Sequence, residues 1–214
     1  MKIRSFIIAY ALVLALLLFA DRRSGLQPDN SYSHVVDLTA ASSDRSTTGS
    51  SAATRIVSPA ALIPGTWSAG QIPAERLIAP LVVMDLKQGN GSQITLEDIA
   101  AWETRRGVVP QGAVVAIRST NSASSSSVPA APITAEAAQF LMDARYVLGF
   151  AVENRTNLTS DRTLARQLAL HGNYVVDGAA RFSELPVAGS LVIVAPAKSK
   201  SLAEAPVRIL AMVR

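Results

Sequence analysis

The chain has 214 residues and a mass of 22.5 kDa, the size of one domain with a full core. Hydrophobic residues make up 49% and charged residues 17%, a balance that excludes a disordered acidic or basic tail. Cysteine is absent, which excludes a disulfide scaffold, Cys-ligated zinc, iron–sulfur ligation and a Cys nucleophile. The net charge of +4 includes Lys2 and Arg4 at the extreme N-terminus. The remaining excess is too weak and too scattered to predict a nucleic-acid partner.

Residues 1–20 have the pattern of a targeting segment. A short basic start precedes the uncharged and almost wholly apolar run 6–20, which is typical of a secretory signal peptide. The run is shorter than the roughly 20 apolar residues of a usual spanning helix, so we favour a signal peptide over an uncleaved membrane anchor. Either outcome places the rest of the chain outside the cytoplasm: exported to the periplasm or the extracellular space, or anchored to the membrane facing outward.

The next segments indicate a linker and the start of a domain. Residues 21–33 are polar and rich in turn formers, which predicts a linker ahead of a domain at 34–214. A first strand is expected at 34–39, followed by a mobile Ser/Thr-rich loop at 40–54. The continuous apolar stretch within 77–86 predicts a strand buried on both faces.

Two helices carry clear N-terminal signals. Thr95, with Asp98 three residues further on, forms a capping-box pattern that predicts a helix over 96–106. Thr134 predicts the N-cap of a second helix over 135–145.

The remaining elements are one short helix, one loop and several strands. The helix is expected at 164–170, a mobile low-complexity loop at 121–127, and the strands at 113–118, 146–152, 174–176, 191–194 and 207–212. Because strands alternate with helices, the sequence predicts a single mixed α/β domain.

The common catalytic motifs are missing from the sequence. It contains no G-x-S-x-G elbow, no P-loop, no G-x-G-x-x-G and no H-E-x-x-H. The two histidines are His34 and His171, and we interpret each as a surface or structural residue rather than a base. Composition and motifs alone therefore indicate an exported α/β domain and assign it no activity.

A longer pattern resembles the cyclase family, which includes bacterial kynurenine formamidase. Its central part matches at Thr54, Pro59, Ile72, Pro73, Glu75, Leu77, Pro80, Val82, Val83 and Asp85. Further matches extend the resemblance over residues 34–213. The resemblance implies a compact mixed-sheet α/β fold, usually assembled as a homo-oligomer. It also implies metal-dependent hydrolysis or cyclisation of amide and related bonds.

The same resemblance places the family's active-site positions on residues that cannot do its chemistry. The family holds zinc or manganese with imidazole and carboxylate groups, and a coordinated water attacks the substrate. The ligand positions fall on Ser51, Arg55, Val57, Ala165 and Asp177, and the base position falls on Ala61.

Asp177 is the one position that keeps a ligand-type side chain. We interpret it as a solvated or strand-end carboxylate in preference to a surviving metal ligand. Arg55 puts a permanent cation where the metal would sit. It is interpreted either as an anion contact in the old pocket, which we favour, or as a surface charge.

Three functions remain open. The leading hypothesis is an exported, non-catalytic family member that has lost its metal site, needs no cofactor and binds an unknown small molecule or protein. The second is a working arylformamidase, which would convert N-formylkynurenine to kynurenine and formate in tryptophan catabolism, with an altered zinc or manganese site. The third is a structural envelope or membrane-associated subunit, attached through residues 6–20. Bound metal, or release of formate from N-formylkynurenine, would support the arylformamidase hypothesis. Co-purification with a membrane partner would support the structural subunit.

Overall fold

The computed structural model describes residues 32–40, 54–86, 93–119, 131–153 and 161–214. The targeting segment, nearly all of the linker, and the Ser/Thr-rich stretches 41–53 and 121–127 lie outside the described residues, so the predictions made for them stay predictions. Within the described ranges, no helix is both long enough and apolar enough to cross a membrane.

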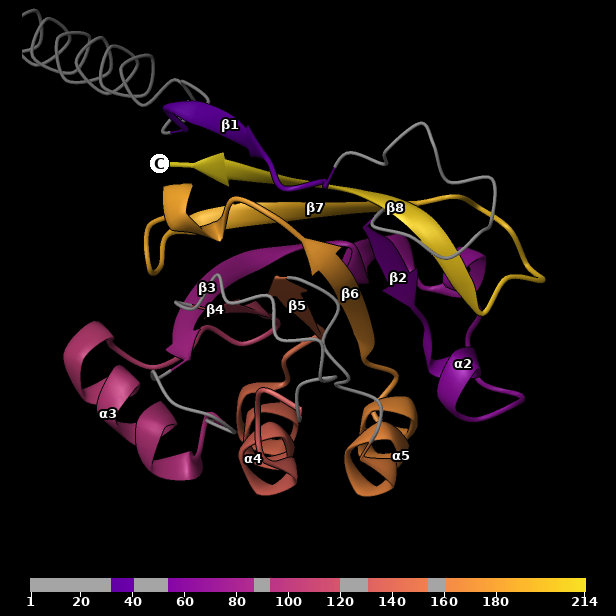
Figure 1. The fold of residues 1–214 in the computed structure, drawn as a ribbon, viewed down its shortest axis with the longest axis horizontal. Helices are drawn as coiled ribbons and strands as arrows, with labels where there is room; N and C mark the ends of the chain where they lie inside the picture. Colours follow the sequence, from indigo (N-terminus) through magenta and orange to yellow (C-terminus); the bar gives the residue numbers. More distant parts are fainter. Residues whose placement is uncertain (1–31, 41–53, 87–92, 120–130, 154–160) are drawn as a thin grey trace, which may run out of the picture. The chain divides into compact units, whose positions relative to one another are not determined.

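Eight strands form one mixed sheet that closes on itself (Figure 1). They are β1 (His34–Asp37), β2 (Arg55–Val57), β3 (Ile78–Leu86), β4 (Val114–Ser119), β5 (Gly149–Glu153), β6 (Tyr174–Ala179), β7 (Ser190–Pro196) and β8 (Glu204–Val213). The strand order is β1-β8-β2-β6-β5-β4-β3-β7, and β8 also pairs with β7. Strands β2 to β8 therefore make a barrel, and β1 extends the sheet beyond β8.

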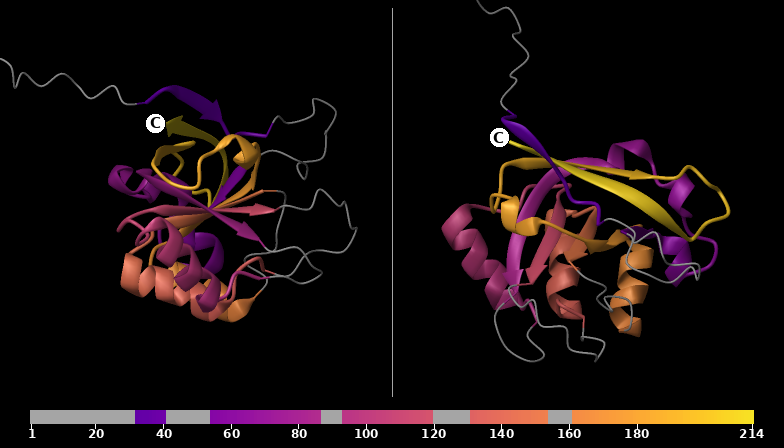
Figure 2. Two further views of the ribbon diagram at one scale, coloured as in Figure 1. Left: turned by 90° about the vertical axis from the view of Figure 1, so that its left-hand side faces the viewer. Right: turned by 45° about the horizontal axis from the view of Figure 1, so that its top comes forward.

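Helices cover the parallel part of this barrel. Strands β3, β4, β5 and β6 run parallel, and parallel neighbours need crossover connections. The helices α3 (Leu96–Arg106), α4 (Ala135–Arg145) and α5 (Arg162–Leu170) lie along one side of the sheet (Figures 1 and 2). The single turn α2 (Pro59–Leu62) packs against α5.

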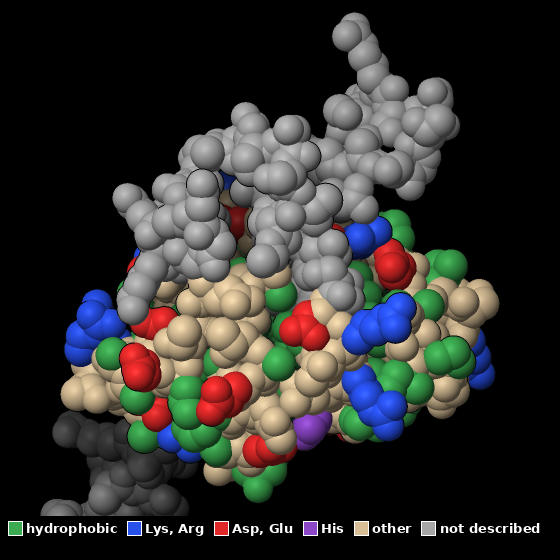
Figure 3. All heavy atoms as spheres, turned by 60° about the horizontal axis from the view of Figure 1, so that its bottom comes forward, with side chains coloured by type: hydrophobic (Ala, Val, Ile, Leu, Met, Phe, Trp, Pro, Cys, Tyr) green, Lys and Arg blue, Asp and Glu red, His purple; other side chains and the backbone are tan. Residues whose placement is uncertain are grey.

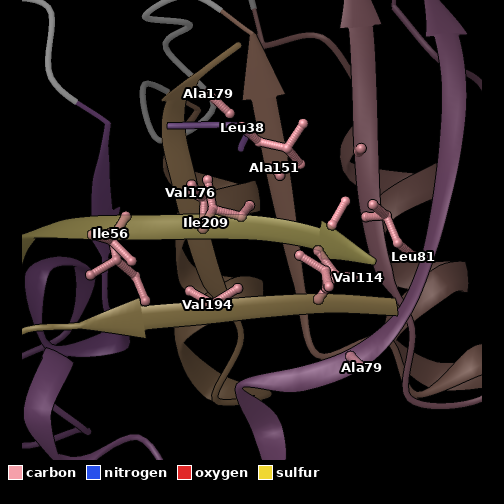
Figure 4. Close-up of a cluster of buried hydrophobic side chains, with 14 of the residues drawn as sticks. Leu38, Ile56, Ala79, Leu81, Val114, Ala151, Val176, Ala179, Val194 and Ile209 are labelled. Carbon is pink, nitrogen blue, oxygen red and sulfur yellow. The ribbon is translucent and has the colours of Figure 1, made fainter. Parts of the chain in front are cut away.

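Side-chain alternation along the strands divides the core into two layers. In β4, Val114 (Figure 4) and Ala116 belong to the cluster inside the barrel, whereas Val115 and Ile117 belong to the cluster beneath the helices. Both layers are apolar, which is why the parallel strands read as continuous hydrophobic runs in the sequence.

The capping signals place the helices correctly. Asp98 N donates to Thr95 Oγ1 at 3.3 Å and Thr95 N donates to Asp98 Oδ2 at 3.0 Å, so the predicted limits of α3 are confirmed. Thr134 caps α4, whose predicted limits are also confirmed. Helix α5 begins at Arg162, earlier than predicted, because the side chain of Asp161 caps it.

Other parts of the fold also differ from the predictions. The strand expected at 146–152 begins only at Gly149, because Tyr146 ends α4 in the left-handed conformation with φ 51°. The strand β2 and the turn α2 were not expected as elements. A strand as short as Arg55–Val57 carries too few residues to show a period of its own.

Candidate functional site

Three of the six positions derived from the resemblance, Arg55, Val57 and Asp177, lie on β2 and β6. These strands are antiparallel, and their register sets Arg55 opposite Asp177 and Val57 opposite Val175. Alternate residues of a strand share a face, so Arg55 and Val57 point to the same side of the sheet. Val57 is 5% exposed and belongs to the apolar cluster beneath the helices.

The guanidinium of Arg55 bridges two carboxylates. Its Nε and Nη2 lie 3.3 Å and 3.2 Å from Asp177 Oδ2, and Nη1 lies 2.8 Å from Glu204 Oε2. The Asp177 side chain is only 6% exposed, against 36% for Arg55 and 46% for Glu204. A nearly buried carboxylate is therefore neutralised by a fixed cation, which a second, more exposed carboxylate also contacts.

These contacts decide between interpretations that the sequence left open. Asp177 is not solvated, so that interpretation is wrong: the side chain is nearly buried and ion-paired. Arg55 is half-buried and paired rather than a free surface charge. Sequence reasoning missed Glu204, which comes from the first residue of β8. The one sequence feature that could have indicated Glu204 is the alternation of apolar and polar residues in β8. Ala205 and Val207 face the barrel core, and Glu204 faces outward.

The other positions offer no chemical group. Ala61 lies exposed on α2 and Ala165 lies half-buried on α5, two elements that pack together. A methyl group neither ligates a metal nor accepts a proton. Ser51 lies outside the described residues.

The donors at these positions do not fit a zinc or manganese ion. A catalytic zinc site needs about three protein ligands and an open position for water. Of the described positions, Asp177 alone provides a usual ligand, and its carboxylate is already bound by Arg55. The described part of the chain contains no group of three or more His, Asp or Glu side chains placed to hold one ion.

The histidines lie apart from this cluster and on the surface, as interpreted from the sequence. His34 is exposed on β1. His171 follows α5, with Nε2 2.8 Å from Asp143 Oδ1 and Nδ1 2.8 Å from the carbonyl oxygen of Gln167. Neither histidine is therefore part of the Arg55 cluster.

A second charged cluster lies at the carboxyl ends of β3, β4 and β5, where ligands often bind in open α/β sheets. Here its contacts are internal. Arg118 pairs with Asp85 through Nε at 2.5 Å and Nη2 at 3.0 Å, and Nη1 donates to the carbonyl oxygen of Phe182 at 3.1 Å. Phe182 N donates to Glu153 Oε1 at 2.9 Å. These bonds hold the segment of Phe182, whose ring is fully buried in the barrel core.

The outer face formed by the helices carries both signs of charge. Figure 3 shows basic and acidic side chains mixed over this side of the domain. Its described residues therefore present no extended surface of a single sign.

The mixed sheet is closed, and crossover helices cover its parallel strands. This architecture is an α/β barrel of the hydrolase-like kind found in the cyclase family. Residues 19–156 match the model of the family described as "Putative cyclase". The chain belongs to this family.

Solved structures show the same fold. Isatin hydrolase A from Labrenzia aggregata, in a structure with benzyl benzoate, is 25% identical with a TM-score of 0.69, over 91% of this chain and 98% of that one. Isatin hydrolase A from Ralstonia solanacearum is 22% identical with a TM-score of 0.69, over 94% and 97% of the two chains. A potential metal-dependent hydrolase with cyclase activity is 20% identical with a TM-score of 0.65, over 85% and 98%. No curated protein matches the chain significantly.

Proposed function

We propose that this chain is an exported, non-catalytic member of the cyclase family, in which an internal cation stands where relatives bind a metal. The observation that carries this proposal is the Arg55 guanidinium, which bridges Asp177 and Glu204. Its binding partner is a small molecule or a protein outside the cytoplasm.

Hydrolysis in the family depends on a water that a metal activates. A metal lowers the pKa of bound water from about 15.7 to about 7. With Arg55 and Val57 at two ligand positions, nothing at the described positions supplies that effect. Ala61 at the base position cannot accept a proton instead. Prolines, caps and core residues match the family while its reactive positions differ, as expected of a chain that keeps the fold without the chemistry.

A working amide hydrolase is the second candidate. It is favoured by the likeness to isatin hydrolase A from Labrenzia aggregata at 25% identity over nearly the whole chain. Under this alternative the chain would act as an arylformamidase or on a related amide, with zinc or manganese held by an altered donor set.

The assay that separates the two candidates follows hydrolysis of isatin and of N-formylkynurenine. We expect no turnover above the uncatalysed rate, with or without added zinc or manganese. Isatin hydrolase A from Labrenzia aggregata serves as the positive control. The double variant Arg55→His/Val57→Asp should stay inactive, because Ala61 and Ala165 still lack reactive groups. Turnover that a chelator abolishes and added metal restores would establish the hydrolase instead.

Export is supported by the basic start and the apolar run 6–20. A fusion of residues 1–25 to a reporter that is active only outside the cytoplasm should be active. The same reporter with Leu16→Arg and Leu17→Arg in the apolar run should be inactive. Equal activity of both fusions, or a full-length chain found wholly in the cytoplasm, would contradict export.

A further inference from the structure

Arg76 differs from the other half-buried arginines of the described chain. Arg55, Arg118 and Arg145 are also half-buried, and each of them pairs with a carboxylate. Arg76, at the end of the 3₁₀ turn η2 (Ala74–Arg76), has no described carboxylate within ion-pairing distance. Burial lowers the pKa of Arg76, and the negative charge of its exposed neighbour Glu75 opposes that shift without forming an ion pair with the guanidinium. Partial burial of an unpaired charge has a free-energy cost, so a cation kept in this state suggests a partner outside the chain.

The surroundings hold the guanidinium of Arg76 in place. Its Cζ lies 5.6 Å from the centre of the Trp67 ring, a cation–π contact. Nη2 donates to the carbonyl oxygen of Gly172 at 3.1 Å. The same ring packs over Gly172, where an added Cβ would lie 3.0 Å from it. The guanidinium is thus oriented before anything binds, which lowers the entropy lost on association.

The hydrogen-bonding capacity of Arg76 is incompletely used. Nε is buried and has no acceptor, and buried donors without partners are rare enough to need an explanation. Nη1 makes no hydrogen bond within the described chain and, unlike Nε, is not buried. This nitrogen therefore keeps N–H donors for an incoming carboxylate.

Exposed apolar side chains lie on the ring that contacts the cation and on the chain segments next to it. Trp67 is 39% exposed and Leu202 is 42% exposed, and the backbones of their segments meet where Ala69 N donates to the Leu202 carbonyl oxygen at 2.9 Å. Leu170, two residues before Gly172, is 65% exposed. We call Trp67, Arg76, Leu170 and Leu202 the Trp67–Arg76 surface. It lies at the amino ends of β3 and β6, whereas Asp177 lies further along β6.

We propose that the Trp67–Arg76 surface binds an acidic segment of a partner protein. A carboxylate of the partner pairs with Arg76, and an adjacent apolar side chain packs on Trp67 and Leu202. Charge complementarity selects an acidic partner, because Arg76 forms no ion pair within the described part of the chain. Exposed Trp and Arg side chains are the residue types that dominate protein–protein hot spots, whereas small-molecule sites are usually concave and mostly apolar. The proposal does not depend on whether the Arg55 cluster is catalytic.

The test measures the anisotropy of a fluorescent, short synthetic peptide of alternating glutamate and leucine, titrated with the full-length protein. We expect saturable binding that weakens as salt rises. Arg76→Gln should weaken binding roughly tenfold or more, as expected for loss of a charge-assisted hydrogen bond. Arg106→Gln, at an exposed arginine of α3, is the matched control and should leave binding unchanged.

A second variant keeps the test independent of the folding of Arg76→Gln. Leu202→Glu adds a charge at an exposed position and should repel the acidic peptide, whereas Leu96→Glu, exposed at 36% on α3, should not. Three results would each overturn the proposal: no saturable binding, equal affinity for Arg76→Gln and the unmodified protein, or equal affinity for a peptide with glutamine in place of glutamate. Displacement of the peptide by benzoate at lower concentrations than by the unlabelled peptide would also overturn it, in favour of a small aromatic acid.

Discussion

Replacing Arg55 with methionine is expected to destabilise the domain by about 2 kcal/mol. Breaking a fully buried ion pair by removing one partner costs about 3–5 kcal/mol, because the other charge is left uncompensated. Asp177 is nearly buried, whereas Arg55 is about one-third exposed, so water reaches part of the pair and reduces the effect. Methionine keeps an unbranched stem about as long as that of arginine up to Nε, so the substitution removes the guanidinium with its charge and hydrogen bonds.

The measurement is equilibrium unfolding in urea, followed by circular dichroism. Arg208→Met is the matched control, because Arg208 also pairs with an aspartate, Asp37, but both side chains are exposed at 67% and 38%. That surface pair should contribute less than about 1 kcal/mol. Equal losses for Arg55→Met and Arg208→Met would show that Arg55 does not neutralise a buried charge.

A double-mutant cycle assigns the loss to the pair itself. Asp177→Leu made in the Arg55→Met background removes the carboxylate that Arg55 no longer pairs with and should recover much of the lost stability, since apolar replacement of a buried pair is often neutral or better. If the double variant loses the sum of the two single losses, the two side chains are not coupled.

Much of the fold could be predicted from local sequence signals. Thr95 with Asp98, and Thr134, gave the limits of α3 and α4 because a cap acts within one turn of its helix. The apolar runs gave β3 and β4 because both faces of a parallel strand are covered. The resemblance to the cyclase family, which the family match confirms, supplied the mixed sheet that these elements build.

The contacts of the site could not be predicted in the same way. Arg55 was singled out by its position in the family pattern, but its partners depend on strand register. Asp177 lies on β6 and Glu204 on β8, and the pairing of β2 with both strands brings them together. The unpaired state of Arg76 is equally invisible in sequence, because it depends on which carboxylates the fold leaves out of reach. Long-range register and burial, rather than residue type, decide both cases.

The second large effect concerns metal binding. If the Arg55 cation stands at a former ligand position, a divalent ion there would meet a like charge at a distance of a few ångströms, where repulsion in a partly buried site is strong. It would also have to displace the guanidinium from Asp177, to which Arg55 donates at 3.2 Å. One carboxylate would then have to hold an ion that usually takes about three protein ligands. We therefore expect no stoichiometric zinc or manganese in the purified protein.

Whether the chain holds a metal ion is measured by elemental analysis of the full-length protein, after growth with added zinc and manganese and dialysis without chelator. We expect far less than one metal ion per chain, with isatin hydrolase A from Labrenzia aggregata carried through the same procedure for comparison. Close to one zinc or manganese ion per chain would contradict this expectation, and would mean that donors beyond Asp177 complete a working metal site.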